Sequence, residues 1–242
     1  MKTNAYKEMY ENELTHPWYQ VTRRLLIAYL ERESNKNVNI LDAGCGTGGT
    51  MKLLMDLGYK VEGLDNNELA IDLCRKRGIS KVRLGNIYSL PYKDKTFDFI
   101  ICLDVLYHQG VFPEKSLREF YRVLKPGGIL YLEEPAYGWL ASKHDIAIET
   151  RQRFTRKLLV KLVKSSNLKI VKASYFNTFL FVPIAAGRIL NKLSNEKSPR
   201  SDVYPTPKIL EMIISKILYL ESKIFENINF PFGLSIICIA QK

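Results

Sequence analysis

The residues best suited to chemistry form a glycine-rich stretch, Asp42-Ala43-Gly44-Cys45-Gly46-Thr47-Gly48-Gly49. Glycine tolerates positive φ and leaves no side chain between the backbone and a ligand. An apolar run precedes the stretch and a helical pattern follows from Met51, so free backbone N–H groups stand at a helix start. Such N–H groups favour polar or anionic ligand groups. The stretch therefore predicts a site for a nucleotide-like cofactor.

Two cofactor patterns fit the same glycines. The first, G-x-G-x-x-G, is the dinucleotide fingerprint and takes Gly49 as its last glycine. The second, D-x-G-x-G-x-G, takes Asp42 and Gly48 instead. Asp65 ends the next predicted strand, where a carboxylate can accept hydrogen bonds from ribose hydroxyls. Because several kinds of adenosine cofactor use such a carboxylate, these residues leave the cofactor open.

Two of the three histidines follow predicted strands, at the sheet edge where ligands gather. His108 follows the strand at 97–103 and is the first candidate for a general base; His144 and Glu134 are alternatives. A loop histidine held by a hydrogen bond is an equally good interpretation of His108. The histidine spacing matches no ligand motif, so no metal site is predicted.

The charge of the chain leaves the question of a partner open. The formal net charge is +11, which suits nucleic acid, a phosphorylated substrate or a membrane surface. The cations are spread along the sequence, however, and this favours a lysine-rich surface that keeps the protein in solution. Arg151, Arg153 and Arg156 form a basic group that suits a substrate carboxylate or phosphate, or a solvated loop.

The elements that must position these residues alternate between strand and helix, which predicts a doubly wound α/β sheet with parallel strands. The predicted strands lie at 37–43, 60–64, 82–84, 97–103 and 129–132, with helices at 50–57, 68–77 and 116–124. Beyond Glu134 the pattern changes. It predicts a helix at 155–163, a strand at 168–176, helices at 182–193 and 208–225, and a strand at 235–240.

This pattern divides the chain of 242 residues into three parts. Residues 1–36 form an N-terminal helical cap or lid, residues 37–178 with 231–242 form the core, and residues 179–230 form a helical insertion that would act as a substrate lid. The helix at 208–225 is amphipathic, which favours packing on the core and leaves peripheral membrane contact as an alternative.

The four cysteines are scattered without a C-x-x-C pair, which suits a reducing compartment and predicts a cytoplasmic location. The first residues are polar, unlike a signal peptide. No stretch approaches the ~18 apolar residues of a membrane span.

Six segments carry a further signal: Leu41–Gly48, Gly63–Asp65, Gly85–Tyr92, Thr96–Ile100, Asp104–His108 and Arg122–Gly128. In this order they resemble class I S-adenosylmethionine-dependent methyltransferases. The sequence is most similar to the small-molecule type 11 group, which includes ubiquinone-pathway methyltransferases. The resemblance covers residues 38–134 and implies a seven-stranded, mostly parallel Rossmann-like sheet with an antiparallel final strand pair.

The resemblance implies that S-adenosyl-L-methionine is bound and leaves as S-adenosyl-L-homocysteine. Gly44 and Gly46 would let the backbone approach its methionine part, and Cys45 belongs to the same loop. Asp42 would contact the amino group of the cofactor, directly or through water. Asp65 would accept from the ribose hydroxyls.

For the adenine, the resemblance implies contacts from Asn66, Asn86 and the backbone N–H of Ile87. Asn86 stands where the family usually has aspartate, but its side-chain carbonyl can still accept from the adenine amino group. Leu103 and Asp104 would line the sulfonium side of the site.

The predicted reaction is methyl transfer to oxygen or nitrogen of a small-molecule, lipid-linked or glycan-linked acceptor. A tRNA-modifying methyltransferase is an alternative because of the positive charge. The segment Leu103–Tyr107 lacks the Asn/Asp-Pro-Pro-aromatic signature of enzymes that methylate base amino groups, so nucleic acid is not favoured as the acceptor. A binding module that keeps the fold without catalysis is a second alternative. The later segments of the sequence do not match the pattern of an NAD-dependent enzyme.

Overall fold

One seven-stranded sheet organises the molecule. The computed structural model describes residues 3–142, 145–146, 148–193 and 208–242. The strand order is β3-β2-β1-β4-β5-β7-β6. Neighbouring strands among β1 to β5 pair in parallel, and β7 runs antiparallel to both β5 and β6. This confirms the predicted fold class. The strands are β1 (Asn39–Ala43), β2 (Lys60–Asp65), β3 (Val82–Leu84), β4 (Phe97–Leu103), β5 (Leu124–Pro135), β6 (Lys169–Phe176) and β7 (Ser235–Gln241).

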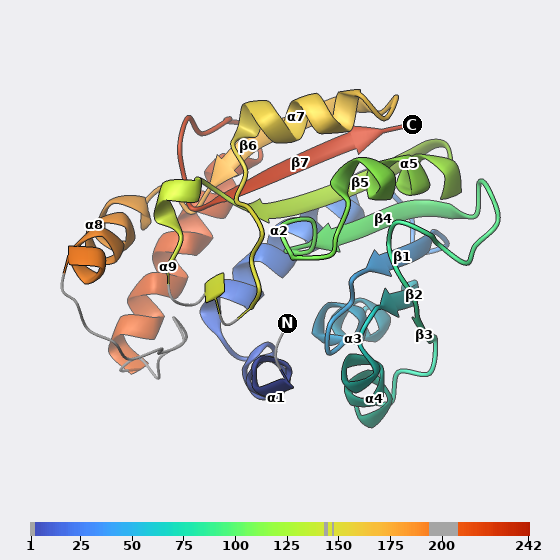
Figure 1. The fold of residues 1–242 in the computed structure, drawn as a ribbon, viewed down its shortest axis with the longest axis horizontal. Helices are drawn as coiled ribbons and strands as arrows, with labels where there is room; N and C mark the ends of the chain where they lie inside the picture. The colour runs from blue at the N-terminus through green and yellow to red at the C-terminus, as the bar shows by residue number, and fades with distance from the viewer. Residues whose placement is uncertain (1–2, 143–144, 147, 194–207) are drawn as a thin grey trace.

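Helices cover both faces of the sheet (Figure 1). Helices α5 and α7 lie on one face, and α2, α3 and α4 lie on the other. Local signals set several boundaries: the Asn67 side chain caps α4, and the Thr155 hydroxyl accepts from the Leu158 N–H to cap α7. The helices are α1 (Thr3–Asn12), α2 (Pro17–Glu33), α3 (Gly49–Asp56), α4 (Glu68–Lys76), α5 (Pro113–Val123), α7 (Arg156–Lys164), α8 (Phe181–Leu193) and α9 (Lys208–Phe225), with a short 3₁₀ turn η1 (Gly138–Leu140).

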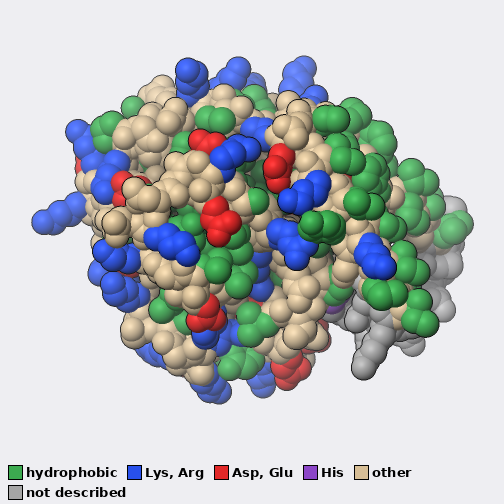
Figure 2. All heavy atoms as spheres, turned by 180° about the vertical axis from the view of Figure 1, so that it is seen from behind, with side chains coloured by type: hydrophobic (Ala, Val, Ile, Leu, Met, Phe, Trp, Pro, Cys, Tyr) green, Lys and Arg blue, Asp and Glu red, His purple; other side chains and the backbone are tan. Residues whose placement is uncertain are grey.

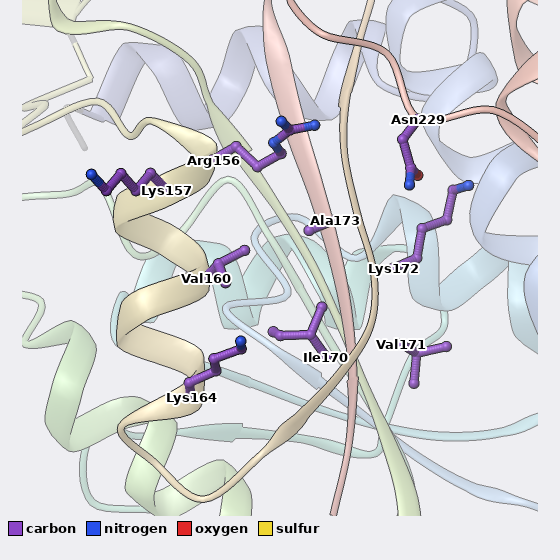
Figure 3. A pocket seen from close by; sticks show the side chains of 9 residues that line it. All are labelled: Arg156, Lys157, Val160, Lys164, Ile170, Val171, Lys172, Ala173 and Asn229. Carbon is purple, nitrogen blue, oxygen red and sulfur yellow. The ribbon is translucent and has the colours of Figure 1, made fainter.

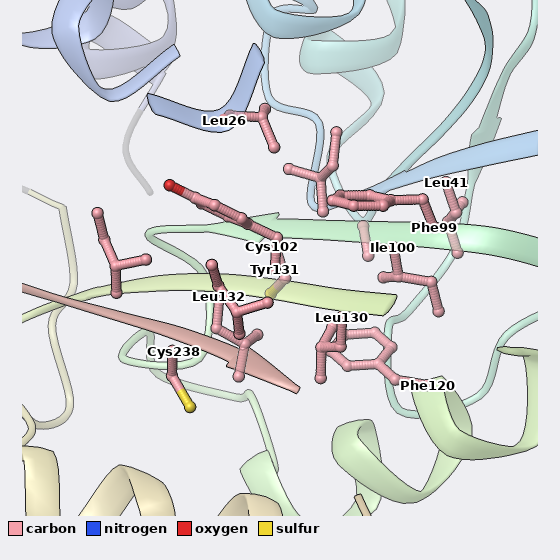
Figure 4. Packing of buried hydrophobic residues seen from close by; sticks show 14 of the residues in the cluster. Leu26, Leu41, Phe99, Ile100, Cys102, Phe120, Leu130, Tyr131, Leu132 and Cys238 are labelled. Carbon is pink, nitrogen blue, oxygen red and sulfur yellow. The ribbon is translucent and has the colours of Figure 1, made fainter. Parts of the chain in front are cut away.

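The core lies on both sides of the central strands, as Figure 4 shows. Strand β4 is apolar along almost its whole length, which a strand buried on both faces requires. Phe99 contacts the ring of Tyr29 in α2, and Tyr131 of β5 does the same. On the other face, Phe120 of α5 is fully buried. These contacts fix the strand ends that carry the candidate site.

Strand β5 differs from its prediction. It begins at Leu124 rather than at Ile129, so the Pro-Gly-Gly sequence lies within the strand. Leu124 pairs with Phe97 and Ile129 with Phe99, so the register shifts between them. Gly127 takes φ +78°, a conformation that glycine adopts without strain. The three residues therefore make a bulge rather than a loop.

The helical insertion is joined to the core by one buried carboxylate. Glu221 of α9 is fully buried and accepts from the N–H groups of Thr178 at 2.7 Å and Phe179 at 3.1 Å. Helix α9 also packs along α2, where the Arg24 guanidinium lies 4.9 Å from the Tyr219 ring centroid. Among the described residues, no helix is both long and apolar enough to cross a membrane.

Candidate active site

The glycine loop after β1 is shaped by close approach of the chain to itself. Gly44 and Gly46 take φ values of +88° and +53°. A Cβ atom at Gly44 would lie 2.4 Å from a methyl of Val105, which follows β4. The Gly46 N–H donates to Asp65 Oδ2 at 2.9 Å. The ends of β1, β2 and β4 therefore meet at one place.

Asp65 is the polar centre of this place. It is 7% exposed, and its Oδ1 accepts from the Asn67 N–H at 3.0 Å. Burial raises the pKa of Asp65, and the N–H groups of Gly46 and Asn67 oppose that rise. A carboxylate in this position beside a glycine loop can accept hydrogen bonds from ribose hydroxyls.

The other predicted cofactor residues lie at the ends of neighbouring strands. Asp42 of β1 is buried, and burial raises its pKa to about 7 although the charge of Arg23 opposes the rise. Cys45 is buried in the loop, where its contact with Cys74 and its burial raise its thiol pKa well above the ordinary value.

The residues expected near the adenine follow β2 and β3, which pair side by side. Asn66 is exposed beside Asp65, Asn86 is exposed, and Ile87 is buried. Leu103 ends β4, at the same edge of the sheet.

The N-terminal segment covers this edge. The Tyr6 hydroxyl of α1 lies 3.5 Å from Asp65 Oδ1, and Met9 Sδ would lie 3.1 Å from a Cβ at Gly46. Tyr6 and Met9 of α1 therefore lie against the same carboxylate and glycine loop.

A buried ion network fixes the end of this segment, and sequence reasoning missed it. Glu13 is 4% exposed and pairs with Arg23 at 2.6 Å and Arg77 at 2.9 Å. It also accepts from the hydroxyl of Thr47, and Arg77 Nε donates to the Thr47 carbonyl at 2.8 Å. No local signal distinguishes Glu13 from its exposed neighbours such as Glu11, because its partners come from distant elements.

A carboxylate cluster lies where β4 and β5 end. Asp104 takes φ +56°, and its N–H donates to the Glu133 carbonyl at 2.8 Å. Burial raises the pKa of Asp104 to about 6, although the charge of Arg153 opposes the rise. The pKa of Glu133 is raised well above its ordinary value by burial and then by the charge of Asp104. Asp104 can therefore change its protonation state near neutral pH.

Glu134 has a different role in this cluster. It is fully buried, and its Oε1 accepts from the N–H groups of Leu106 at 2.8 Å and Val105 at 3.3 Å. Burial, and then the charge of Asp104, raises its pKa well above the ordinary value. These bonds hold the turn that carries Asp104 and His108.

His108 is committed to a hydrogen bond. Its Nδ1 lies 2.8 Å from the Ile148 carbonyl, so this nitrogen carries the proton. Burial lowers the pKa of His108 to about 4. The ring is therefore neutral at pH 7 and only weakly basic. The alternative candidate, His144, lies outside the described residues.

The three arginines 151, 153 and 156 do not form one group. Arg153 pairs with Asp145 at 2.7 Å inside the protein. Arg151 donates to the Val111 carbonyl at 3.3 Å, and Arg156 lies 5.6 Å from the Tyr175 ring centroid. Arg153 therefore fixes a loop and influences Asp104 through its charge.

Aromatic side chains gather beside the carboxylate cluster. The Tyr137 and Tyr175 rings stack with centroids 5.1 Å apart, and Trp139 lies 5.8 Å from Tyr137. Phe181 of α8 contacts both Tyr137 and Trp139, and Phe232 contacts Phe181. Trp139 is half exposed. An apolar molecule could pack against this group.

An open groove of about 390 Å³ lies elsewhere, along the β6 edge of the sheet (Figure 3). Arg156, Lys157, Lys164 and Lys172 line it. The glycine loop follows β1, on the other side of β4, β5 and β7, so this groove is not part of the candidate site. Lys172 lies on the edge strand β6 itself, where a lysine discourages pairing with another chain.

Comparisons with known proteins find one family domain in this chain. Residues 41–132 match the methyltransferase domain model. These residues form a methyltransferase domain, and its methyl donor is S-adenosylmethionine. A geranyl diphosphate C-methyltransferase from Streptomyces coelicolor, whose structure contains S-adenosyl-L-homocysteine, has a TM-score of 0.62 and 15% identity to this chain, with 92% of this chain and 78% of that one covered. At this identity the likeness shows the fold alone.

Two relatives of known name are similar over part of the chain. The sterol 24-C-methyltransferase of Schizosaccharomyces pombe is 32% identical over 115 residues, which is 43% of this chain and 28% of the relative. The norajmaline N-methyltransferase of Rauvolfia serpentina is 27% identical over 140 residues, which is 54% of this chain and 48% of the relative. The chain thus spans less than half the length of either relative.

Proposed function

We propose that this protein transfers a methyl group from S-adenosylmethionine to a small-molecule, lipid-linked or glycan-linked acceptor. One observation carries the proposal: the buried Asp65 carboxylate accepts from the Gly46 N–H at 2.9 Å, within the matched domain. S-adenosylmethionine supplies an electrophilic methyl group. The protein would supply alignment of the acceptor and exclusion of water.

We propose that the glycine loop holds the methionine part of the cofactor. Gly44 and Gly46 would allow the cofactor to approach the backbone closely, and Cys45 would line the same loop. The buried Asp42 would face the amino group of the cofactor. Asp65 would take the ribose hydroxyls in place of Tyr6.

The adenine would lie between residues that follow β2 and β3. Asn66, Asn86 and the N–H of Ile87 are the proposed contacts. Leu103 and Asp104, at the end of β4, would line the side of the site where the methyl group leaves.

The proposed base is Asp104 rather than His108, Glu134 or His144. A general base is most effective when its pKa is near the working pH. The pKa of Asp104 is raised to about 6, whereas that of His108 is lowered to about 4. Glu134 already accepts from two backbone N–H groups. Such a base matters for an oxygen acceptor more than for a neutral amine.

The aromatic group around Tyr137 supports an acceptor with an apolar body. The S. pombe relative is named for a sterol and the R. serpentina relative for norajmaline. We propose an acceptor that combines an apolar body with a nucleophilic atom, oxygen or nitrogen. A cytoplasmic location is part of the proposal, because the four cysteines are free and buried.

Calorimetric titration with S-adenosyl-L-homocysteine tests the cofactor site. Asp65→Ala removes charge-assisted hydrogen bonds, so we expect at least ~30-fold weaker binding. Asp72→Ala is the matched control, because that carboxylate lies on an exposed part of α4. Equal affinities of both variants and the parent protein would contradict the proposal.

Labelled S-adenosylmethionine, incubated with the protein and fractionated cell extract, then identifies the acceptor. With that acceptor, kcat/KM should fall on acidification through about pH 6, the pKa of Asp104. Asp104→Asn should lose this limb and keep its affinity for S-adenosyl-L-homocysteine. A limb near pH 4 that His108→Ala removes would return the role of base to His108.

A further inference from the structure

The outer side of the insertion is apolar. Large apolar side chains on α8 and α9 are between 45% and 71% exposed, although a helix that only covers a core would expose polar ones. We call them the insertion surface. Its members are Val182, Ile189, Leu190, Ile209, Met212, Ile213 and Leu220.

The inner side of α9 already has its partner. Leu218, Glu221 and Phe225 are buried, and α9 packs along α2. The exposed residues lie on the opposite side of the same helix, because residues three or four apart share a face. The insertion surface is therefore not the side of α9 that holds the insertion on the core.

The charges beside this surface are positive. Lys216 and Lys223 are exposed and lie on the same side of α9 as Ile213 and Leu220. The acidic side chain of the helix that the structure describes, Glu221, is buried. Figure 2 shows hydrophobic side chains gathered near the grey residues, with Lys and Arg among them. Lysine stems can lie along apolar surface and keep their charged ends in the headgroup region, so lysines among exposed apolar side chains are compatible with a lipid–water interface.

We propose that the insertion surface binds the face of an anionic lipid bilayer. The apolar residues would enter the headgroup region, while the two lysines extend along them to lipid phosphates. The net charge of +11 adds long-range attraction to such a membrane. A symmetric pairing of two copies through α9 would instead bring Lys216 and Lys223 of both copies together, and this like-charge contact disfavours it.

The position of the insertion surface indicates a role for membrane binding in delivering the acceptor. This role rests on the proposed function. Helix α8 contacts η1, and its Arg188 donates to the Leu140 carbonyl at 3.1 Å. Phe181 of α8 also belongs to the aromatic group around Tyr137. A lipid-soluble acceptor could therefore pass from the bilayer along α8 toward Asp104.

Vesicle flotation of the full chain tests the proposal. We expect binding to vesicles of phosphatidylcholine with phosphatidylglycerol at low salt, and much weaker binding to phosphatidylcholine alone. Ile213→Ser with Leu220→Ser, and separately Lys216→Gln with Lys223→Gln, should each weaken binding about tenfold.

Matched controls lie on α7, on the other face of the sheet. Leu158→Ser removes an exposed apolar side chain, and Lys157→Gln with Lys161→Gln removes the same charge as the lysine pair on α9. These controls should keep most of the binding. Circular dichroism and titration with S-adenosyl-L-homocysteine check that every variant is folded.

Three outcomes would overturn the proposal. The first is failure of the parent chain to bind anionic vesicles at low salt. The second is an equal loss of binding in the α7 controls and the α9 variants. The third is a dimer in light scattering that Leu220→Ser dissociates, which would assign the surface to a second copy. Because flotation needs no methyl acceptor, its result is independent of whether methyl transfer is found.

Discussion

Two coverings flank the carboxyl edge of the sheet, and different forces hold them. The N-terminal cap, formed by α1 and α2, ends in the buried ion network of Glu13 and lies over the glycine loop. The insertion, formed by α8 and α9, is joined by Glu221 and by packing on α2, and its outer side is apolar. The N-terminal cap covers the polar glycine loop with buried charged groups. The insertion exposes apolar side chains to solvent.

This difference teaches that buried polar groups lie on the side proposed for the cofactor, whereas exposed apolar groups lie on the side proposed for the acceptor. A buried charge is tolerated only when its partners are placed accurately, so the cap is tied to one arrangement. Apolar contact is less directional, so the insertion could adapt to partners of different shape. Each variant below alters one of the two coverings or the carboxylates between them.

The largest effect is expected at the cap. Glu13→Ala would leave the buried Arg23 and Arg77 without their carboxylate partner, and such a loss costs about 3–5 kcal/mol of unfolding free energy. Thermal unfolding should therefore begin about 10 °C lower. Glu11→Ala, on an exposed part of the same segment, is the control. Equal melting temperatures of the two variants would mean that the network does not hold the cap.

The insertion should tolerate the loss of its carboxylate better. Glu221→Ala leaves the N–H groups of Thr178 and Phe179 without their acceptor, at a cost of about 2 kcal/mol. Urea unfolding measures this loss, and Glu226→Ala, just beyond α9 and exposed, is the control. A loss larger than that of Glu13→Ala would reverse the comparison between the two coverings.

The carboxylates between the coverings predict a dependence on pH. The pKa of Asp104 is raised from 3.8 to about 6, so ionisation of Asp104 destabilises the folded state as the pH rises through this range. Asp104→Asn removes that cost and should raise the unfolding free energy by about 1 kcal/mol above pH 6. This value is reduced for the partial solvent access of Asp104. The gain should vanish below about pH 4. Denaturant unfolding at pH 4 and pH 8 measures it, and a gain that is independent of pH would refute the account.

The smallest effect is expected on the outer side of the insertion. Leu220 is 59% exposed, so Leu220→Ser should change the unfolding free energy by less than about 0.5 kcal/mol. Leu218→Ser, on the buried side of the same helix, should cost about 2 kcal/mol or more. Similar losses in both variants would mean that the outer side is covered by protein in solution.

Much of the fold could be predicted from local pattern. The helices at 182–193 and 208–225 were expected within one residue of α8 and α9, since apolar spacing at the helical period identified both. The bulge in β5 was not predicted, because Pro-Gly-Gly is typical of the end of a helix. Only the pairing with β4 shows that the strand continues through these residues.

The candidate site was predicted less completely. The strand–turn–helix pattern of the sequence predicts Asp65 and the glycines as site residues. The structure brings Asp65 and the glycine loop within hydrogen-bond distance. His108 was preferred as a base because of its position alone. Its burial, which lowers its pKa, and its hydrogen bond to the Ile148 carbonyl depend on a segment forty residues away in sequence.

The sequence by itself determined the order of strands and helices, the glycine turn and the acid at the end of β2, because these depend on residues close together in the chain. Only the tertiary structure decided which charges are buried and which apolar faces are not. Glu13 meets Arg77 across 64 positions, and Leu220 is exposed because α2 occupies the other side of α9. Burial, and the pKa values that follow from it, arise from segments far apart in the chain, so local spacing cannot determine them.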